Sequence, residues 1–343
     1  LVNNKKKRWA LMKKTFLMII FIIVIVSVSS CTMEQTNSKE LEQVTIAEAG
    51  QPIGALLYIA LENNYFEEEG LNVTIKSYTS GKDSLNIGII EENANFATTA
   101  ETPIVLNSLN NKDKEISVIA TIGTAKENMA IVAKKESGIF SSNDLNGKTI
   151  AVTANTNAAF FLDVFLLFND LVDKVNIENE NPEAMVDLLI NNEVDAVTAW
   201  NPHLTKIQQE LGENATYFST EGIYTWTWNM VSTTEYVTQN PDITKKLLTA
   251  LYKAEIFVNE KPDESIAKVA DHLNLAEDEL EAAWDILNLE LSLEQSFLVL
   301  LEDQSRWAIE NELTDAVEIP NYLDNIYLDA LDEVKPSSVG IIQ

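Results

Sequence analysis

The chain has 343 residues, with 53 acidic and 24 basic side chains, so its formal charge at pH 7 is −29. A surface this acidic repels nucleic acid and anionic lipid, so neither is expected as a binding partner. Cys31 is the only cysteine, and the sequence therefore excludes disulfides, thiolate metal sites and a cysteine nucleophile from the folded body.

The N-terminal segment has the features of an export signal. Six cations lie between Lys5 and Lys14, and an uninterrupted apolar run of eleven residues extends from Phe16 to Val26. A membrane-spanning helix needs about 20 apolar residues, so this run predicts a signal peptide over residues 1–30 and not a permanent span. Val28-Ser29-Ser30-Cys31 resembles the bacterial lipobox, in which the cysteine receives a lipid and becomes the mature N-terminus. We expect lipidation at Cys31, the alternative being a cysteine that merely follows a signal sequence.

The next part of the chain predicts alternating strands and helices. Residues 31–43 are polar and lack apolar periodicity, as in a flexible tether. Val44 and Ile46 then alternate with polar neighbours as in a strand, and Gly50-Gln51-Pro52 precedes a helical run from Ala55 to Glu69. The elements expected after it are a strand at Leu71 to Tyr78, a helix at Asp83 to Glu91, a strand at Asn95 to Thr98, a helix after Pro103 and a strand at Ile116 to Ile122. This alternation favours a mostly parallel sheet with helices on its faces.

A second alternating block precedes a helical C-terminal part. Its expected elements are strands at Thr149 to Val152, Val175 to Ile177 and Asp195 to Thr198, and helices at Ala158 to Asn169 and Pro182 to Asn191. The helices expected after it are Asp242 to Glu260, Asp263 to His272, Ala276 to Asn288 and Ser292 to Asn311. These amphipathic segments either form a helical domain of their own or, as we favour, return to cover the first sheet. The roughly 310 residues after the signal suit two domains.

Five motifs in order resemble one protein family. They are Ala60 to Val73, Ser80-Gly81, Ala100 to Pro103, Asp144 to Val152 and Trp200-Asn201-Pro202. The set is similar to the nitrate, sulfonate and taurine type of solute-binding proteins of ABC importers, which also includes thiamine-pyrimidine receptors. One departure is that Thr98, Thr99 and Ala100 stand where glycines are usual in the family.

The resemblance implies an α/β fold of the two-lobe periplasmic-binding-protein type (type II), with the ligand in a cleft between lobes joined by two chain crossings. The crossings are expected near Gly123 to Asn128 and near Asn229 to Thr233. Lobe 1 would comprise residues 44–124 and 232–343, and lobe 2 residues 125–231. The implied function is capture of a small organic solute outside the cytoplasmic membrane by a lipid-anchored monomer, and its delivery to an ABC permease with its ATPase.

The candidate site follows from the predicted topology as well as from the resemblance. In open α/β sheets ligands bind beyond the carboxyl ends of strands, which selects the loops near residues 49–52, 79–81, 98–101, 154–158 and 200–202. The candidate ligand-binding residues are Gln51, Ser80, Thr99, Glu101, Asn128, Thr156, Asn157, Trp200, Trp226 and Trp228. The alternatives are that Thr156 or Asn157 simply caps a helix and that the tryptophans pack in a core.

The charges near these loops bear on the ligand. Arg8 and Arg306 are the only arginines, so the pocket loops cannot supply a bidentate arginine clamp. The nearby cations are Lys82 and Lys126, and the nearby carboxylates are those of Glu48, Glu101 and Glu127. Aromatic rings with carboxylates favour a neutral or cationic heteroaromatic solute, with nitrate or a sulfonate as the alternative.

The sequence does not predict an enzyme. His203 and His272 are the only histidines and are far apart in the chain, without the spacing of a metal site or a nucleophile and base. There is no glycine-rich phosphate loop, and neither a metal nor a cofactor is expected. A ligand-binding sensor that reports to a membrane receptor is the remaining alternative.

Overall fold

The computed structural model describes residues 8–9, 40–110, 114–127, 129–220, 223 and 225–342. The chain divides into two units, Leu1–Glu40 and Leu41–Gln343, and the fold given below is that of the second unit. The predicted signal peptide except residues 8–9, the lipobox, nearly all of the tether, and Asn128 lie outside the described residues. Within the described part of the chain, no helix is both long and apolar enough to cross a membrane.

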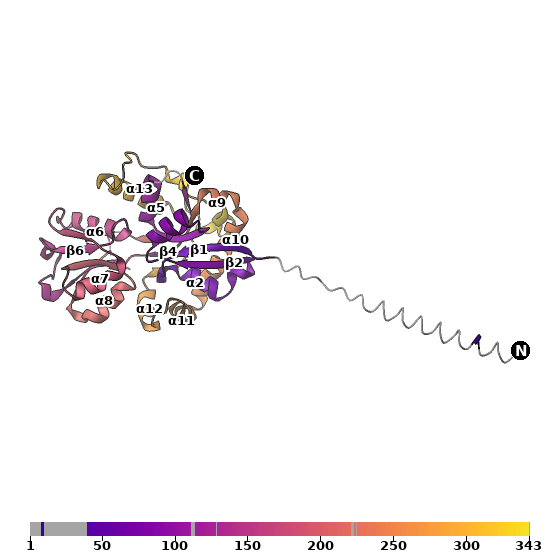
Figure 1. The fold of residues 1–343 in the computed structure, drawn as a ribbon, viewed down its shortest axis with the longest axis horizontal. Helices are drawn as coiled ribbons and strands as arrows, with labels where there is room; N and C mark the ends of the chain where they lie inside the picture. Colours follow the sequence, from indigo (N-terminus) through magenta and orange to yellow (C-terminus); the bar gives the residue numbers. More distant parts are fainter. Residues whose placement is uncertain are drawn as a thin grey trace. The chain divides into compact units, whose positions relative to one another are not determined.

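Two separate sheets form the framework of residues 41–343 (Figure 1). The first has six strands in the order β11-β4-β10-β3-β1-β2. Strand β1 is parallel to β2 and β3, whereas β10 is antiparallel to both β3 and β4. The strand bounds are β1 Glu42–Glu48, β2 Leu71–Ser77, β3 Phe96–Ala100, β4 Ile116–Ala125, β10 Trp226–Thr233 and β11 Leu287–Asn288.

The second sheet has five strands in the order β7-β6-β8-β5-β9. They are β5 Met129–Lys134, β6 Thr149–Val152, β7 Asn176–Asn179, β8 Ala196–Trp200 and β9 Ala215–Ser219. Its helices are α6 Asn157–Phe168, α7 Met185–Ile190 and α8 His203–Leu211. Because side chains alternate along each strand, the sheet has two cores: Ile131 packs with Phe161 of α6, and Val132 packs with Leu189 of α7.

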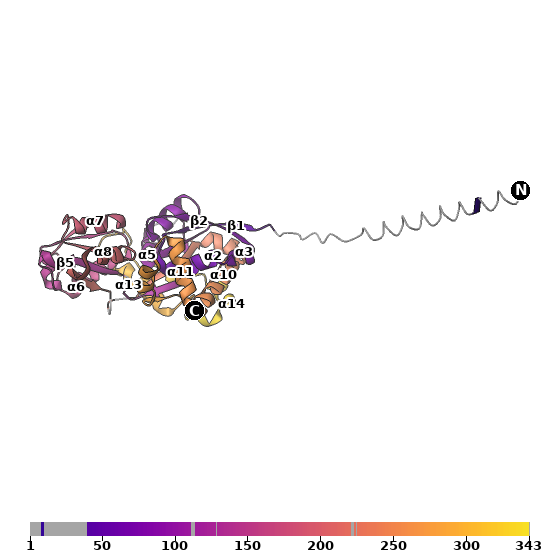
Figure 2. The same ribbon diagram turned by 90° about the horizontal axis from the view of Figure 1, so that it is seen from below.

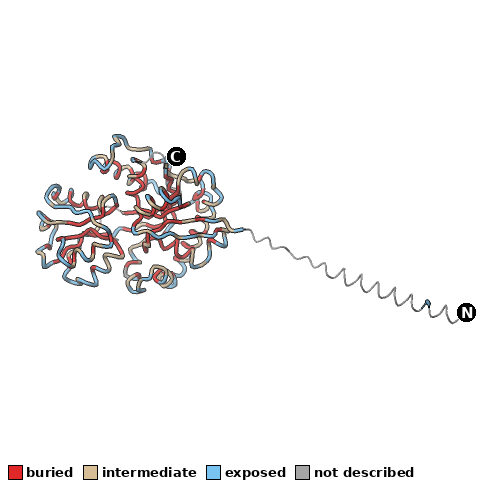
Figure 3. The backbone as a smooth tube through the Cα atoms, viewed as in Figure 1, coloured by how far each residue is buried: buried red, intermediate tan, exposed pale blue. Residues whose placement is uncertain are grey.

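The C-terminal helices complete the first lobe, as expected. Leu247 and Leu251 of α10 belong to one continuous apolar core with Ile46 and Phe96 of the first sheet. Figures 2 and 3 show these helices around buried strands. The helices of this lobe are α2 Ala55–Glu62, α3 Tyr65–Glu68, α4 Gly81–Asp83 continuing as a π-helix over Ser84–Glu91, α5 Glu101–Asn110, α9 Thr234–Gln239, α10 Pro241–Glu260, α11 Pro262–Leu273, α12 Glu277–Trp284, α13 Gln295–Glu310 and α14 Asp329–Val334.

Short 3₁₀ turns connect these elements: Pro52–Gly54, Lys135–Ser137, Ser142–Leu145, Pro182–Ala184, Gly212–Asn214, Tyr322–Asn325 and Pro336–Ser338. Two expected helices are shorter than the sequence indicates. The first ends at Glu62, because Asn64 has a left-handed φ of 59° and starts a new helical turn. The other ends at Trp284, since Leu287 and Asn288 pair with β4 as a strand.

The chain passes between the sheets twice, once between β4 and β5 and once between β9 and β10. The first passage lies within the expected Gly123 to Asn128 region. The second precedes Trp226, whereas we expected it at Asn229 to Thr233. Those residues lie inside β10, which pairs with both β3 and β4, so the segment 226–231 belongs to the sheet of lobe 1 and not to that of lobe 2. The other lobe boundaries stay a prediction.

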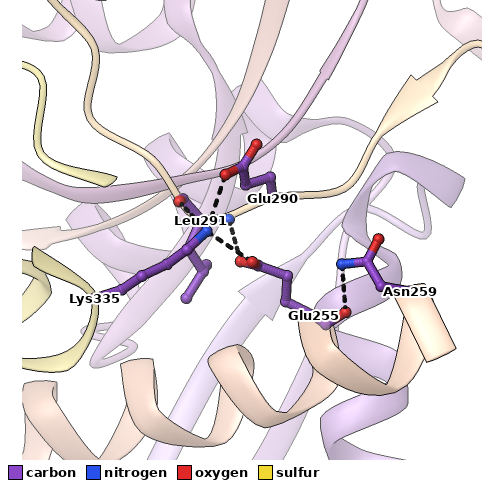
Figure 4. A network of polar contacts seen from close by, with 5 residues as sticks. All are labelled: Glu255, Asn259, Glu290, Leu291 and Lys335. Atoms are coloured by element: carbon purple, nitrogen blue, oxygen red, sulfur yellow. Dashed lines mark hydrogen bonds and ion pairs between the residues drawn. The ribbon is translucent and has the colours of Figure 1, made fainter. Parts of the chain in front are cut away.

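A buried ion pair fixes the C-terminal segment to α10 (Figure 4). The Nζ atom of Lys335 lies 2.7 Å from Oε1 of Glu255, 3.0 Å from Oε1 of Glu290 and 3.2 Å from the carbonyl oxygen of Leu291. The other carboxylate oxygen of Glu255 accepts a hydrogen bond from the backbone N–H of Leu291 at 2.7 Å. Burial alone would lower the pKa of Lys335, but its hydrogen bonds to Glu255 and Glu290 outweigh this effect and raise the pKa.

We expect the Lys335→Met variant to lose about 3 kcal/mol of unfolding free energy, because it leaves the buried Glu255 carboxylate without its counter-ion. Urea unfolding measures the loss. The matched control is Lys245→Met, which removes an exposed ion pair with Glu333 and should cost much less, because water and salt screen an exposed pair. Equal losses in the two variants would contradict the importance of the buried pair.

Candidate ligand-binding cleft

A narrow cavity lies where loops and helix ends of the two lobes meet. Its volume is about 20 Å³, which is room for about one water molecule, so the structure is a closed form of the cleft. The lining residues come from the ends of β1, β3, β6 and β8, from the starts of helices, and from β10. They are Gln51, Ser80, Gly81, Lys82, Ala100, Pro103, Thr156, Asn157, Trp200, Trp226 and Trp228.

The structure brings most of the predicted site residues together here. Those lining the cavity are Gln51, Ser80, Thr156, Asn157, Trp200, Trp226 and Trp228. Thr99 and Glu101 do not line it, and Asn128 lies outside the described residues. The sequence prediction omitted Gly81, Ala100 and Pro103, although they adjoin the selected loops, and it named Lys82 only as a nearby cation.

Gly81 makes room for the indole of Trp228, whereas a Cβ at Gly54 would be at ordinary contact distance from it. A Cβ atom at Gly81 would lie 2.7 Å from Cη2 of Trp228, closer than such atoms can approach. A Cβ atom at Gly54 would lie 3.4 Å from its Nε1 atom. The ring of Trp226 meets that of Trp228 edge to face, with centroids 6.0 Å apart and an interplanar angle of 75°. The two indoles therefore form a packed pair on the cleft side of β10.

Three buried polar atoms of the cleft residues have no hydrogen-bond partner within the described part of the chain. They are Nε1 of Trp226, Nε1 of Trp228 and Oε1 of Gln51, in side chains of residues that are 2%, 4% and 5% exposed. Buried polar groups are nearly always hydrogen-bonded in native proteins, and leaving one unpaired costs about 1–3 kcal/mol. These atoms are therefore candidates for contacts with a bound solute.

The start of α6 adds a positive end to the cleft. Thr156 immediately precedes the helix, and its hydroxyl donates to the carbonyl oxygen of Thr153 at 2.6 Å and does not cap α6. The helix dipole places partial positive charge at this end. On α4, Nζ of Lys82 lies 3.4 Å from the carbonyl oxygen of Ala154. Among the described residues, Lys82 is the one charged side chain that lines the cavity.

Glu101 is buried behind β10 and not in the cleft. Its Oε2 atom accepts hydrogen bonds from the amide and hydroxyl of Thr227, at 3.0 and 3.2 Å. Its Oε1 atom accepts one from Nε2 of Gln304 of α13 at 3.1 Å. Burial raises the pKa of Glu101 despite these donors. The carboxylate thus ties β10 to α5 and α13, and Thr227 points to it because side chains alternate with Trp226 and Trp228.

Glu48 is likewise occupied by protein donors. Its carboxylate accepts hydrogen bonds from the hydroxyl of Tyr58 at 2.8 Å, from that of Ser77 at 2.5 Å and from the amide of Gly50. Burial raises the pKa of Tyr58, with the charge of Glu48 acting in the same direction. These bonds hold the loop after β1 that presents Gln51. Glu127 is exposed, so none of the three carboxylates that we expected near the ligand lines the cavity.

Helices α6 and α13 connect the two lobes beside the cleft. Nε1 of Trp307 donates to Oδ2 of Asp163 at 2.9 Å. The ring of Trp307 also meets that of Phe160 edge to face, with centroids 5.4 Å apart. Burial raises the pKa of Asp163, and its bond to Trp307 opposes this effect. The contact holds α6, whose N-terminus lines the cleft, against a helix of the first lobe.

Comparison with known proteins assigns the family. The model of the family described as "NMT1/THI5 like" matches residues 51–265. The chain belongs to this family. A Brucella abortus relative named as a binding protein is 24% identical to this NMT1/THI5-like chain over 240 residues, covering 65% of the chain and 69% of the relative.

Solved structures show the same fold. The alkanesulfonate-binding protein SsuA from Xanthomonas axonopodis pv. citri, bound to MOPS, is 15% identical with a TM-score of 0.73, over 84% of this chain and 99% of that one. The periplasmic aliphatic sulphonate binding protein SsuA from Escherichia coli is 15% identical with a TM-score of 0.72, over 83% of this chain and 97% of that one. These likenesses establish the two-lobe periplasmic-binding-protein fold. The desulfurization enzyme DszB shares this fold at 17% identity and a TM-score of 0.64, over 86% of this chain and 99% of that one. The fold alone therefore does not decide between binding and catalysis.

We expect Trp307→Phe to open the cleft in the absence of any solute. The variant keeps the ring contact with Phe160 and removes the donor of the partly buried Asp163, which shifts the equilibrium between closed and open forms by about tenfold. Small-angle scattering should then give a larger radius of gyration than for the wild type. Trp284→Phe, on α12 and away from α6, is the control and should leave the value unchanged. A Trp307→Phe variant as compact as the wild type would refute the expected role of this bond.

Proposed function

We propose that this chain is an extracytoplasmic solute-binding protein that captures a small organic anion in the cleft and delivers it to an ABC importer. The observation that carries the proposal is that Lys82 and the start of α6 line the cleft together with Trp226 and Trp228, whose buried N–H groups have no partner among the described residues. All of them are positive or donate hydrogen bonds. Membership of the NMT1/THI5-like family and the names of the structural neighbours, alkanesulfonate-binding proteins, support it.

The position of the carboxylates supports an anionic solute over the neutral or cationic one that the sequence favoured. The case for a neutral or cationic solute relied on aromatic rings, nearby carboxylates and the missing arginine, and the carboxylates of Glu48 and Glu101 bind protein donors away from the cavity. A cation would meet Lys82 and the positive end of α6 without a compensating carboxylate among the described lining residues. An oxyanion would instead find donors already in place. The tryptophans remain part of the proposed site and supply apolar contact to the organic portion of the solute.

The lining and the size of the cleft fit the proposed binding role. Within the described residues its lining contains neither a histidine nor a cysteine nor a carboxylate, the groups that commonly act as general base or nucleophile. No group of three or more potential metal-ligating side chains occurs in the described part of the chain. A full solute also exceeds the 20 Å³ of the closed cavity, so the lobes must separate for entry, as expected of a receptor that closes around its ligand.

Export and anchoring complete the proposed role. The charged and apolar N-terminal segment directs the chain across the cytoplasmic membrane, and a lipid on Cys31 holds it at the outer face as a monomer. There it would meet its permease, which works with an ATPase. The second candidate function, a ligand sensor for a membrane receptor, would use the same cleft and the same anchor.

We expect ethanesulfonate to bind and raise the melting temperature, whereas ethyl methyl sulfone, its neutral analogue of similar shape, should not. A ligand at about 100 times its dissociation constant adds about 2.7 kcal/mol of stability, which a thermal melt detects. Lys82→Gln should weaken ethanesulfonate binding by about 10- to 100-fold in calorimetric titration, because a charge-assisted hydrogen bond is lost. Lys126→Gln is the control, since Lys126 is exposed and does not line the cavity. Equal binding of ethanesulfonate and ethyl methyl sulfone would rule out the proposal that the solute is an anion.

We expect Cys31→Ala to move the protein from the membrane fraction to the soluble secreted fraction of a bacterial host, because the lipid acceptor is gone. Cell fractionation with immunoblotting measures the shift, and Ser30→Thr, which keeps the cysteine, serves as a control. Membrane retention of the Cys31→Ala variant would exclude the lipid anchor.

A further inference from the structure

Two contacts join the lobes beside the cleft, and they lie on opposite faces of the second sheet. Phe161 of α6 belongs to the core on one face of that sheet, and Ile207 of α8 belongs to the core on the other. Helix α6 contacts α13 of lobe 1, whereas α8 contacts α12. Figure 1 shows α6 and α13 on one side of the region between the lobes and α8 and α12 on the other. The cleft thus has one contact on each side.

The contact between α6 and α13 is buried. Trp307 and Phe160 are 8% and 7% exposed, and their rings meet edge to face. The Nε1 atom of Trp307 donates to Oδ2 of Asp163 at 2.9 Å, and burial raises the pKa of this carboxyl group. Separating the two helices would expose both aromatic rings to water and take this donor away from a partly buried carboxylate. Opening the cleft on this side therefore costs considerable free energy.

The contact between α8 and α12 is exposed. The Nε2 atom of Gln209 donates to Oε1 of Glu279 at the protein surface. An exposed polar contact contributes little to stability, because water takes the place of each partner when the contact breaks. The cleft can therefore open on this side at a much smaller cost than on the side of α6 and α13.

The hinge has room to bend next to α12. Strand β11 follows α12 and consists of Leu287 and Asn288, which pair with Ala125 and Thr124 at the end of β4, where the chain leaves for lobe 2. Asn288 and Glu290 line two cavities, one of about 600 Å³ between β4, β10 and α13, and one of about 420 Å³ beside α10 and α12. A two-residue strand with open space in two places beside it can follow the end of β4 when the crossing bends.

We propose that lobe 2 turns about its contact with α13, so that the cleft opens between α8 and α12 and the solute enters and leaves on that side. The start of α6 then moves with lobe 2, while Phe160 and Asp163 stay against α13. This inference rests on the proposed function in taking the cleft as the binding site, and it adds the route of access. Its test uses no solute, so its failure leaves the anion receptor standing, and a failure of ethanesulfonate to bind leaves the one-sided opening standing.

The test measures distances between spin labels across each side of the cleft by pulsed electron–electron double resonance. Cys31→Ala leaves the introduced cysteines as the only thiols of the full chain. The first pair, Gln208→Cys with Asp278→Cys, spans α8 and α12, and the second, Leu167→Cys with Glu310→Cys, spans α6 and α13; all four positions are exposed. We expect the distance distribution of the first pair to be at least about twofold broader and to extend to longer distances, because only this side populates an open form.

Two variants test the cause of the difference. Trp307→Phe should broaden the distribution of the second pair to about the width of the first, because it removes the donor of the buried contact. Gln209→Met is the matched change on the other side and should leave the first pair nearly unchanged, since the bond that it removes is exposed. Equal widths in the wild type, or a broader second pair, would overturn the one-sided opening. A second pair that Trp307→Phe leaves narrow would overturn the role of the buried contact as the turning point.

Discussion

The arrangement of the cleft depends on the way β10 is held in the middle of the first sheet. The alternation of its side chains places Trp226 and Trp228 on the cleft side and Thr227 and Asn229 on the other. On that second side, Thr227 donates twice to the buried carboxylate of Glu101. A shift of β10 by one residue would put threonines into the cleft and take the two Thr227 donors away from the buried Glu101 carboxylate, so the polar network fixes the register that presents the indoles.

Helix α13 connects this network to the closure of the lobes. Gln304 and Trp307 are three residues apart and so lie on one face of the helix, where the first donates to Glu101 and the second to Asp163 of α6. Helix α13 is thus linked through Glu101 to the strand that carries the tryptophans, and it directly contacts the helix whose start lines the cleft. Movement of α6 away from α13 would break the hydrogen bond between Trp307 and Asp163. The hydrogen bond between Gln304 and Glu101 would remain and keep β10 in place. The site therefore has a fixed half on β10 and a movable half on α6.

The sequence predicted the parts of the site that depend on local patterns. The loops at strand ends, the alternation of Trp226 with Trp228, and the position of Thr156 before a helix could all be read from spacing, and the structure brings these residues together. The sequence could not predict which way the side chain of Glu101 points, because this depends on Gln304, some 200 residues further along the chain. For the same reason the second passage between the sheets was misplaced: the pairing of β10 with both β3 and β4 is a long-range property.

The strong negative charge of the chain does not argue against an anionic solute. Interactions between exposed charges are screened beyond about 8–10 Å at physiological salt, whereas the proposed solute would lie beside Lys82 and the start of α6 in a site from which water is largely excluded. The absence of arginine from the pocket loops is also no obstacle. Indole N–H groups, a helix N-terminus and one ammonium can together supply hydrogen-bond donors and positive charge, and they would spread them around the solute where an arginine would concentrate them on one side. Net charge and residue counts therefore describe the surface of this protein, while the solute it takes depends on which few polar atoms are left unpaired inside the cleft.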